Sequence, residues 1–317
     1  MTLSKEDIIA SEERIKGYIH HTPVLSSENI NKLCGCKLYF KCENFQKAGA
    51  FKSRGACNTL MQLSNKEKEN GVITHSSGNH AGALSKVAQY YGVKAYIVMP
   101  STAPRVKVEA VKSYGGEIEF CEPTLEAREN NMLRIQKNTG ATEIHPYNNE
   151  NIIAGQATAA KELIDSMNSS LDIIIAPVGG GGLISGTALS AHYFSPSTKV
   201  YAGEPLGADD AYKSFKKKEL VPSVKPNTIA DGLLTSLGSK TFPVIMEHVD
   251  DIFRVYEKTI VTAMKLIWER MKIIVEPSAA VPLAAVLDYP EVFKNKEVGL
   301  ILSGGNLDLN NLPWQCD

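Results

Sequence analysis

The chain has 317 residues, of which 43% are hydrophobic and 22% charged, and its formal net charge is −1. This composition is typical of a globular protein, and the length favours two domains or one large domain with an inserted lobe. The near-neutral charge gives no general attraction to nucleic acid or to an anionic membrane. Its start has no basic segment followed by an apolar one, and no apolar run approaches the roughly 20 residues that span a bilayer, so we expect a soluble, cytoplasmic protein.

Strand-like and helix-like segments alternate along most of the chain. We expect strands at 37–43, 72–75, 95–99, 118–121, 142–145, 172–178, 199–202, 252–256 and 298–302, and helices at 81–91, 106–114, 125–138, 152–167, 183–194, 259–271 and 278–287. Such an alternation is typical of βαβ units. The sequence therefore predicts an α/β fold of two domains, each with a mostly parallel sheet flanked by helices. Residues 1–64 and 149–317 form the predicted large domain, and residues 65–148 form a small inserted domain.

The strongest local signal is the run of four glycines at 179–182, which follows an apolar strand and precedes a helix. Glycines let the backbone approach a ligand, and the start of the helix adds partial positive charge that favours phosphate. The run matches neither the dinucleotide pattern nor the Walker A pattern. A tight strand–helix turn without a ligand is the alternative.

Two more loops follow predicted strands in the same way. Residues 76–80 read Ser-Ser-Gly-Asn-His, and residues 303–306 read Ser-Gly-Gly-Asn. In α/β folds, ligands bind at the carboxyl ends of parallel strands. The amide and hydroxyl groups of residues 76–80 could hold a substrate carboxylate, or they could cap the following helix.

Lys52 is the candidate reactive residue. It follows the strand at 37–43, in the run Ala50-Phe51-Lys52-Ser53-Arg54-Gly55. An amine, a phosphate-binding loop and a carboxylate-binding loop together indicate pyridoxal-phosphate chemistry.

Two other groups of residues are candidates for metal binding. Glu204 and Asp210 follow a strand and could supply oxygen ligands to Mg²⁺ or Ca²⁺, or form a solvated acidic loop. The cysteines contain no Cys-x-x-Cys pair, and we interpret them as buried or incidental thiols. Of these, Cys34 and Cys36 could hold a metal only with partners elsewhere. The six cysteines are Cys34, Cys36, Cys42, Cys57, Cys121 and Cys316.

Nearly the whole chain resembles the fold-type II pyridoxal-phosphate enzymes (the tryptophan synthase β-like fold), and within them the serine racemase and serine/threonine dehydratase group. The motifs that carry the resemblance are His21-Thr22-Pro23-Val24, Lys41-Cys42-Glu43-Asn44-Phe45-Gln46, Phe51-Lys52-x-Arg54-Gly55-Ala56, Ala154-Gly155-Gln156, Ala230-Asp231-Gly232 and Ser303-Gly304-Gly305-Asn306. The resemblance implies two α/β domains with the cofactor between them, a small amino-acid substrate and a homodimer.

The resemblance also implies roles for particular residues. Lys52 resembles the lysine that forms the Schiff base, Asn79 the partner of the ring hydroxyl, and Ser303 the partner of the pyridine nitrogen. The implied cofactor positions are Phe51, Lys52, Asn79, Gly179, Gly180, Gly181, Gly182, Leu183, Gly232, Glu276 and Ser303. The implied substrate positions are Ser76, Ser77, Asn79, His80 and Arg128.

The residue at position 77 distinguishes the racemases from the dehydratases within the group. Dedicated threonine dehydratases usually have alanine there, whereas serine racemases have serine. The resemblance therefore implies that Lys52 works on one face of the substrate and Ser77 on the other, although Ser77 could instead only cap a helix or hold the carboxylate. Because a neutral Ser303 cannot keep the pyridine nitrogen protonated, we also expect elimination of serine to pyruvate and ammonia. A dehydratase acting on threonine, serine or 3-hydroxyaspartate is the alternative, and a catalytically silent phosphate-ligand-binding protein is the third.

Two regulatory sites are implied by the same resemblance. Glu204, the Ala208 carbonyl and Asp210 match the divalent-cation site of serine racemases. The positions of an ATP-effector site at the dimer interface are matched by Ser26, Ser27, Lys47 and Tyr114. One departure is Gly82, which stands where the family often has glutamine near the nucleotide.

Overall fold

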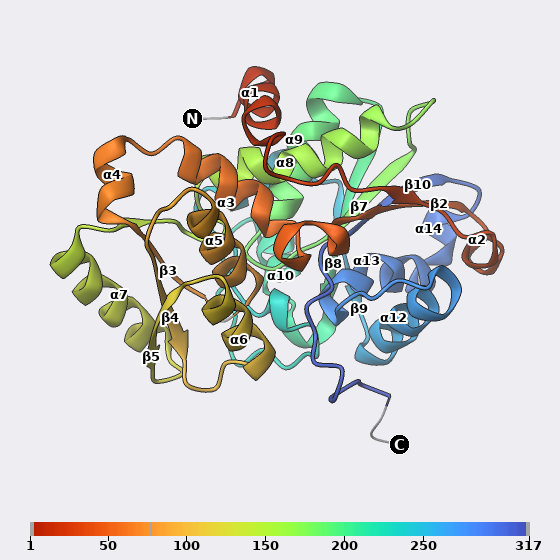
Figure 1. Cartoon of the computed structure of the whole chain (residues 1–317). Coiled ribbons are helices and arrows are strands. Elements are labelled where there is room, and N and C mark those ends of the chain that lie inside the picture. Colours follow the sequence, from red (N-terminus) through yellow and green to blue (C-terminus); the bar gives the residue numbers. More distant parts are fainter. Residues whose placement is uncertain (1–2, 77, 315–317) are drawn as a thin grey trace.

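The structure is a computed structural model and describes residues 3–76 and 78–314. Its strands form a six-stranded and a four-stranded sheet, which lie in two neighbouring halves of the molecule (Figure 1). We call these the large-sheet half and the small-sheet half. The predicted α/β fold with two mostly parallel sheets is confirmed.

The six-stranded sheet has the order β1-β2-β10-β7-β8-β9. Its strands are β1 (Val24–Leu25), β2 (Lys37–Cys42), β7 (Ile173–Pro177), β8 (Lys199–Pro205), β9 (Asp251–Val255) and β10 (Glu297–Leu302). Strand β1 is antiparallel to β2, and the other neighbours are parallel. Each residue of β7 is buried, as expected for a central parallel strand covered on both faces. Because Leu302 pairs with Cys42, the loops that follow β10 and β2 leave the sheet at the same edge.

The four-stranded sheet has the order β5-β4-β3-β6, and its neighbours are all parallel. Its strands are β3 (Val72–His75), β4 (Ala95–Pro100), β5 (Glu117–Cys121) and β6 (Thr142–Glu143). All four lie within the predicted small domain at 65–148, and the strands of the other sheet lie outside it. The domain boundaries themselves stay a prediction.

The helices cover both sheets (Figure 1). Local signals fix several ends: the Asn149 side chain accepts hydrogen bonds from the first turn of α8, and α7 ends at Gly140 in the left-handed region. The α-helices are α1 (Lys5–Ile15), α2 (Glu28–Cys34), α3 (Lys52–Met61), α4 (Asn65–Asn70), α5 (Asn79–Tyr90), α6 (Arg105–Ser113), α7 (Leu125–Thr139), α8 (Glu150–Asp165), α9 (Gly182–Phe194), α10 (Asp210–Lys217), α11 (Thr241–His248), α12 (Glu257–Met271), α13 (Pro277–Asp288) and α14 (Pro290–Phe293). Short 3-10 helices are η1 (Glu43–Phe45), η2 (Lys47–Gly49), η3 (Leu206–Ala208) and η4 (Asp231–Leu233).

Helix α3 connects the two halves. Its residues Ala56 and Leu60 share a hydrophobic core with Val72 of β3 and with α5. On another side α3 packs tightly against α8, since a Cβ atom on Gly155 would lie only 2.6 Å from the Cα atom of Gly55. The first residue of this helix, Lys52, is therefore held by both halves.

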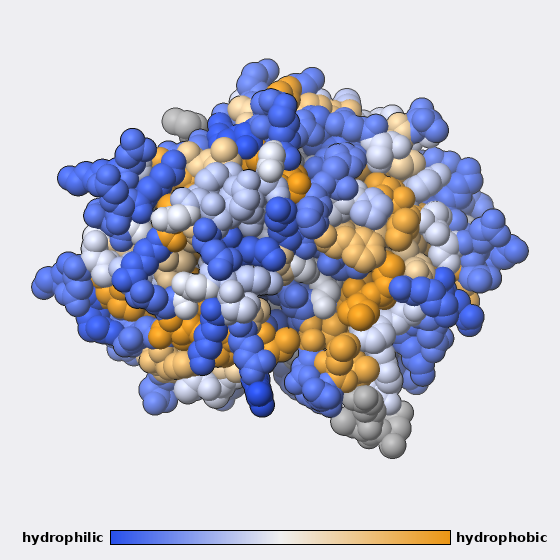
Figure 2. Space-filling view, viewed as in Figure 1, coloured by the Kyte–Doolittle hydropathy of each residue, from blue (hydrophilic) through white to orange (hydrophobic). Residues whose placement is uncertain are grey.

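The surface is mixed in character. Figure 2 shows hydrophilic residues over most of one face, groups of apolar residues to the right of the middle and at the lower left, and a hollow at the lower edge between the two halves. Within residues 3–76 and 78–314, none of the helices has both the length and the hydropathy needed to span a bilayer.

Candidate active site

A cavity of about 410 Å³ lies at the carboxyl ends of the parallel strands. Loops that follow β3, β7 and β10 reach it, as α/β architecture requires for a ligand site. The sequence-predicted residues among its lining are Phe51, Lys52, Ser76, Asn79, His80, Arg128, Gly179, Gly180, Gly181, Gly182, Leu183, Gly232, Glu276 and Ser303. Folding thus brings together segments that are far apart in the sequence.

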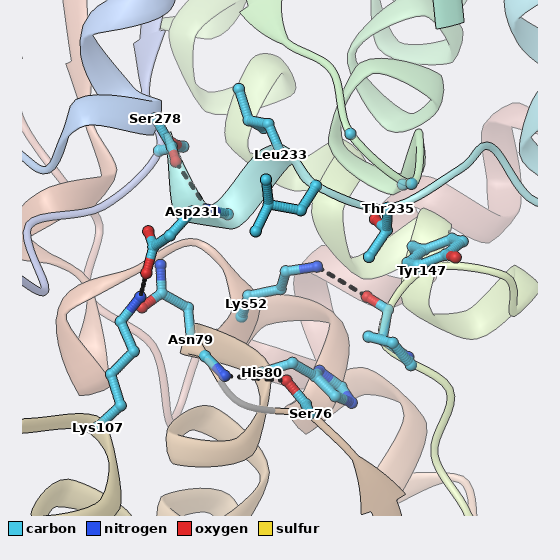
Figure 3. Close-up of a pocket in the computed structure, with 18 of the residues that line it drawn as sticks. Lys52, Ser76, Asn79, His80, Lys107, Tyr147, Asp231, Leu233, Thr235 and Ser278 are labelled. Carbon is cyan, nitrogen blue, oxygen red and sulfur yellow. Dashed lines mark hydrogen bonds and ion pairs between the residues drawn. The ribbon is translucent and has the colours of Figure 1, made fainter. Parts of the chain in front are cut away.

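Lys52 points into this cavity (Figure 3). Its Nζ atom donates a hydrogen bond of 2.9 Å to the Pro146 carbonyl and lies 5.0 Å from the centre of the Phe51 ring. Burial lowers the pKa of Lys52 to about 8, although Glu276 opposes this change. A much larger share of Lys52 is therefore an uncharged, nucleophilic amine at neutral pH than for an exposed lysine.

The glycine loop has no room for side chains. A Cβ atom on Gly180 would lie 2.3 Å from the Tyr147 ring, and one on Gly179 would lie 2.9 Å from the Cα atom of Leu233. Gly181 has a φ of 90°, which strains any other residue. Packing thus explains part of the glycine run, while the start of α9 at Gly182 leaves backbone N–H groups suited to an anion.

The loop at residues 76–80 borders the cavity from the small-sheet half. Asn79 donates a 2.6 Å hydrogen bond to Glu276 Oε1, and its own oxygen accepts one of 3.0 Å from Asn306. The Nε2 atom of His80 is 2.9 Å from the Ile144 carbonyl oxygen, and burial lowers the pKa of His80 to about 3. The imidazole is therefore neutral at physiological pH. Ser77 lies outside the described residues.

Glu276 is buried at the inner wall of the cavity. Burial raises the pKa of this carboxyl to about 7, against the opposing effect of Lys107. Among the described residues, its Oε2 atom has no well-aligned hydrogen-bond partner. Ser303 is buried and also reaches the cavity.

Several lining residues were missed by the sequence analysis, notably Lys107, Tyr147, Asp231 and Ser278. The Ser278 hydroxyl accepts a 3.0 Å hydrogen bond from the Gly232 amide. Tyr147 packs edge-on against His145 with 4.6 Å between the ring centres. The motif Ala230-Asp231-Gly232 is the sequence signal that points to Asp231, since it is shared with the family that the chain resembles.

The residues of the implied cation site lie together and do not line this cavity. The two carboxylate oxygens of Glu204 each accept a 2.8 Å hydrogen bond, from the amides of Ala211 and Tyr212. Burial raises the pKa of Glu204 well above its usual range and that of Asp210 to about 6. Neither carboxylate oxygen of Asp210 has a well-aligned partner in the described part of the chain. Ala208, at the end of η3, is also buried.

These two carboxylates form a small ligand set. No three His, Cys, Asp or Glu side chains converge as metal ligands anywhere in residues 3–76 and 78–314. A cation at this site therefore needs carbonyl or water oxygens as well. The cysteines that the structure describes are free thiols, and they are Cys34, Cys36, Cys42, Cys57 and Cys121, whereas Cys316 lies outside the described residues.

The residues of the implied effector site also lie outside the cavity. Ser26 donates a 2.8 Å hydrogen bond to the Leu38 carbonyl, and Ser27 precedes α2. Lys47 Nζ lies 4.7 Å from the centre of the Tyr18 ring. The Tyr114 ring lies under a different lysine, at 4.5 Å from Lys86 Nζ.

A buried lysine with a lowered pKa, a glycine loop at a helix start and a cavity at the ends of mostly parallel strands define an α/β enzyme with a phosphorylated carbonyl cofactor. Residues 15–304 match the model of the pyridoxal-phosphate dependent enzymes. The chain belongs to this family.

Among individual members of this family, the chain is similar to serine racemases and to a beta-hydroxyaspartate dehydratase. A serine racemase of Dictyostelium discoideum is 50% identical over 315 residues, covering 98% of this chain and 97% of that one. A beta-hydroxyaspartate dehydratase of Paracoccus denitrificans (strain Pd 1222) is 48% identical over 309 residues, covering 98% of each chain. The solved structure of maize serine racemase has a TM-score of 0.95 at 45% identity, covering 98% of this chain and 95% of that one.

Proposed function

We propose that this chain is a serine racemase that interconverts L-serine and D-serine, with elimination of serine to pyruvate and ammonia as a second reaction. The observation that carries the proposal is the buried amine of Lys52 in the family's cofactor cavity. Serine racemases from several organisms, at 45–50% identity over nearly the full length, support serine as the substrate.

The residues present fit pyridoxal phosphate. The loop at 179–182 excludes side chains and opens onto the start of α9, which suits the phosphate. Lys52 suits the covalent attachment, and Asn79 and Ser303 are polar groups on the cavity wall. When bound, the cofactor withdraws electrons from the substrate Cα, so that its proton becomes acidic.

The chain's own residues then hold the substrate and move the proton. The loop at 76–80 receives the carboxylate, and the neutral His80 supports it without adding charge. Lys52 Nζ takes the Cα proton from one face as a free amine. Ser77 Oγ exchanges a proton on the opposite face, a role that rests on the resemblance to serine racemases. If the β-hydroxyl leaves as water instead of Cα being reprotonated, the remaining enamine takes up water and yields pyruvate and ammonia.

The remaining features of this proposal concern regulation and assembly. We propose a divalent cation (Mg²⁺, Ca²⁺ or Mn²⁺) bound by Glu204, the Ala208 carbonyl and Asp210, supported by the buried Asp210 carboxylate, neither of whose oxygens has a well-aligned hydrogen-bond partner in the described part of the chain. We also propose a cytoplasmic homodimer with ATP as an effector near Ser26, Ser27, Lys47 and Tyr114.

A dehydratase of 3-hydroxyaspartate is the second candidate. The beta-hydroxyaspartate dehydratase at 48% identity favours it, and so does the cationic side chain of Arg128 on the cavity wall. This cation would attract a second carboxylate on the substrate.

Chiral analysis of L-serine turnover, with pyruvate measured in parallel, tests the proposal. The Ser77→Ala variant should lose D-serine formation and keep much of the pyruvate formation, because only the second face has lost its proton donor. Ser76→Ala is the control, and it should weaken both reactions together through the substrate carboxylate. Persistent D-serine formation in Ser77→Ala would place the second base elsewhere. Turnover of 3-hydroxyaspartate without any D-serine from the unaltered protein would favour the second candidate.

A further inference from the structure

Lys107 links the two halves of the molecule at the cavity. It lies on α6 in the small-sheet half, and its side chain is only 8% exposed. Its ammonium group forms an ion pair with Asp231, the first residue of η4 in the large-sheet half. Figure 3 shows Lys107 reaching up to Asp231, with Asn79 beside the pair.

The ammonium group of Lys107 also lies beside the loop that we assign to the substrate carboxylate. A Cβ atom on Gly78 would be 3.9 Å from Lys107 Nζ, and no other atom outside Gly78 and its chain neighbours would be closer to it. A lysine so close to this loop adds positive charge where a carboxylate is expected.

Two acidic residues near this loop make the positive charge of Lys107 necessary. Asp231 is paired with Lys107, and the buried Glu276 lies near enough for Lys107 to lower its pKa. Burial alone would lower the pKa of Lys107, but Glu276 and Asp231 outweigh it and raise this pKa. Lys107 therefore stays charged. Without it, an incoming carboxylate would meet the unpaired negative charge of Asp231, whose side chain is 40% exposed, next to the buried carboxyl of Glu276.

We propose that Lys107 is a positioning residue for substrate binding: it neutralises Asp231 beside Gly78, so that the cavity accepts the substrate carboxylate. This inference rests on the proposed function, in that the loop at 76–80 receives an amino-acid substrate. A purely mechanical link between the halves would be lost when either Lys107 or Asp231 is replaced. Neutralisation differs from such a link, because Lys107 is needed only as long as the Asp231 carboxylate is present.

Four variants of the cofactor-loaded protein separate these roles. Lys107→Met should raise KM for L-serine by about tenfold or more, with a smaller change in kcat, because ground-state binding is lost. Asp231→Asn should lower KM, since it removes negative charge. The double variant should recover much of the loss caused by Lys107→Met, and Lys107→Arg should keep most of the affinity. Lys112→Met, an exposed lysine on the same helix, is the matched control and should leave KM unchanged.

A second readout does not depend on turnover. The upward shift of the melting temperature on addition of L-serine should be smaller in Lys107→Met and restored in the double variant. The proposal is overturned if Asp231→Asn weakens serine binding as much as Lys107→Met does and the double variant is no better, which is the result for a mechanical link. It is also overturned if Lys107→Met leaves KM unchanged. If Lys107→Met does not fold, the KM of Asp231→Asn alone tests the proposal: a lower KM for L-serine supports it, and a higher KM contradicts it.

The same series with 3-hydroxyaspartate keeps this test apart from the test of the proposed function. A protein that dehydrates 3-hydroxyaspartate and makes no D-serine would fail as a serine racemase, yet the order of KM values among the variants would still decide the role of Lys107.

Discussion

At the scale of single residues, burial sets the protonation of the active site. Lys52, His80 and Glu276 are all shifted toward their neutral forms, and in each of them burial is the largest cause. A neutral amine can attack a carbonyl carbon, and a neutral imidazole does not repel Lys52. The same physical effect thus prepares the nucleophile and keeps its surroundings free of competing charge.

The lowered pKa of Lys52 leads to a pH prediction for the cofactor-free protein. Covalent uptake of pyridoxal phosphate needs the uncharged amine, so its rate should rise with pH, with a midpoint near the Lys52 pKa of about 8 rather than the ordinary 10.5. Glu276→Gln should move this midpoint downward, since Glu276 raises the Lys52 pKa. The growth of visible absorbance after mixing measures the rate, and Lys52→Arg is the blank. A midpoint near that of exposed lysines would contradict the burial argument.

At the scale of elements, the turn from β8 through η3 into α10 concentrates two carboxylates. Glu204 ends up buried because its oxygens bond to the amides of the first turn of α10. Asp210 starts the same helix and has its carboxylate buried without a strong partner. Such an arrangement costs stability whenever Asp210 is ionised, unless a cation compensates for it.

The expected consequence is a pH-dependent response to divalent cations. The Asp210 pKa is raised from 3.8 to about 6, so the folded state loses stability as pH rises between these values. Mg²⁺ or Ca²⁺ should therefore raise the melting temperature at about pH 8, where Asp210 is ionised, and much less at about pH 5. Asp210→Asn should lose the response. Asp209→Asn should keep it, because Asp209 pairs with Lys213 and Arg254 instead. An equal response at both pH values would speak against this site.

At the scale of the whole molecule, a buried ionic network ties α3 to its surroundings. Arg54 donates to Glu43 and to Glu162 at 2.7 Å, and Lys41 donates to Glu162 at 2.6 Å. These four side chains come from β2, η1, α3 and α8, and they are buried. Their charges sum to zero, so each carboxylate has a cation and no net charge is left inside.

Removing one charge from this network should destabilise the whole fold. Glu162→Gln leaves a buried excess of positive charge, and we expect it to cost about 3–5 kcal/mol of unfolding free energy. Glu150→Gln, on the same helix, breaks an exposed pair with Lys240 and should cost less than about 1 kcal/mol. Urea unfolding with a common slope measures the difference. Similar costs for the two variants would mean that the network is not the anchor of α3.

The loops could be predicted from the sequence because their signals are local. Each signal reflects what one short segment needs: glycines for a close turn, an Asn to cap a helix start, and an apolar run for the buried strand before each loop. The same local rules gave the long strands and helices, but β6 is shorter than expected, ending at Glu143. Helices α1 to α4, α10, α11 and α14 were not predicted from the sequence. Of these, α3 buries even polar residues such as Ser53, Arg54 and Asn58, which removes the usual amphipathic pattern.

The order of amino acids sets which chemical groups are available: an amine at Lys52, glycines for an anion, and hydroxyl and amide groups for a carboxylate. How the pKa values of these groups are shifted, and which groups pair, depends on the folded arrangement of the chain. Asp231 lies 124 residues from Lys107, and Glu276 lies 197 residues from Asn79, yet each pair is in contact. Such contacts depend on how the two halves pack, and so does the burial that lowers the pKa of Lys52. Neither these contacts nor this burial can be read from local sequence patterns, because such patterns reflect the backbone of one segment and not the neighbours that folding brings to it.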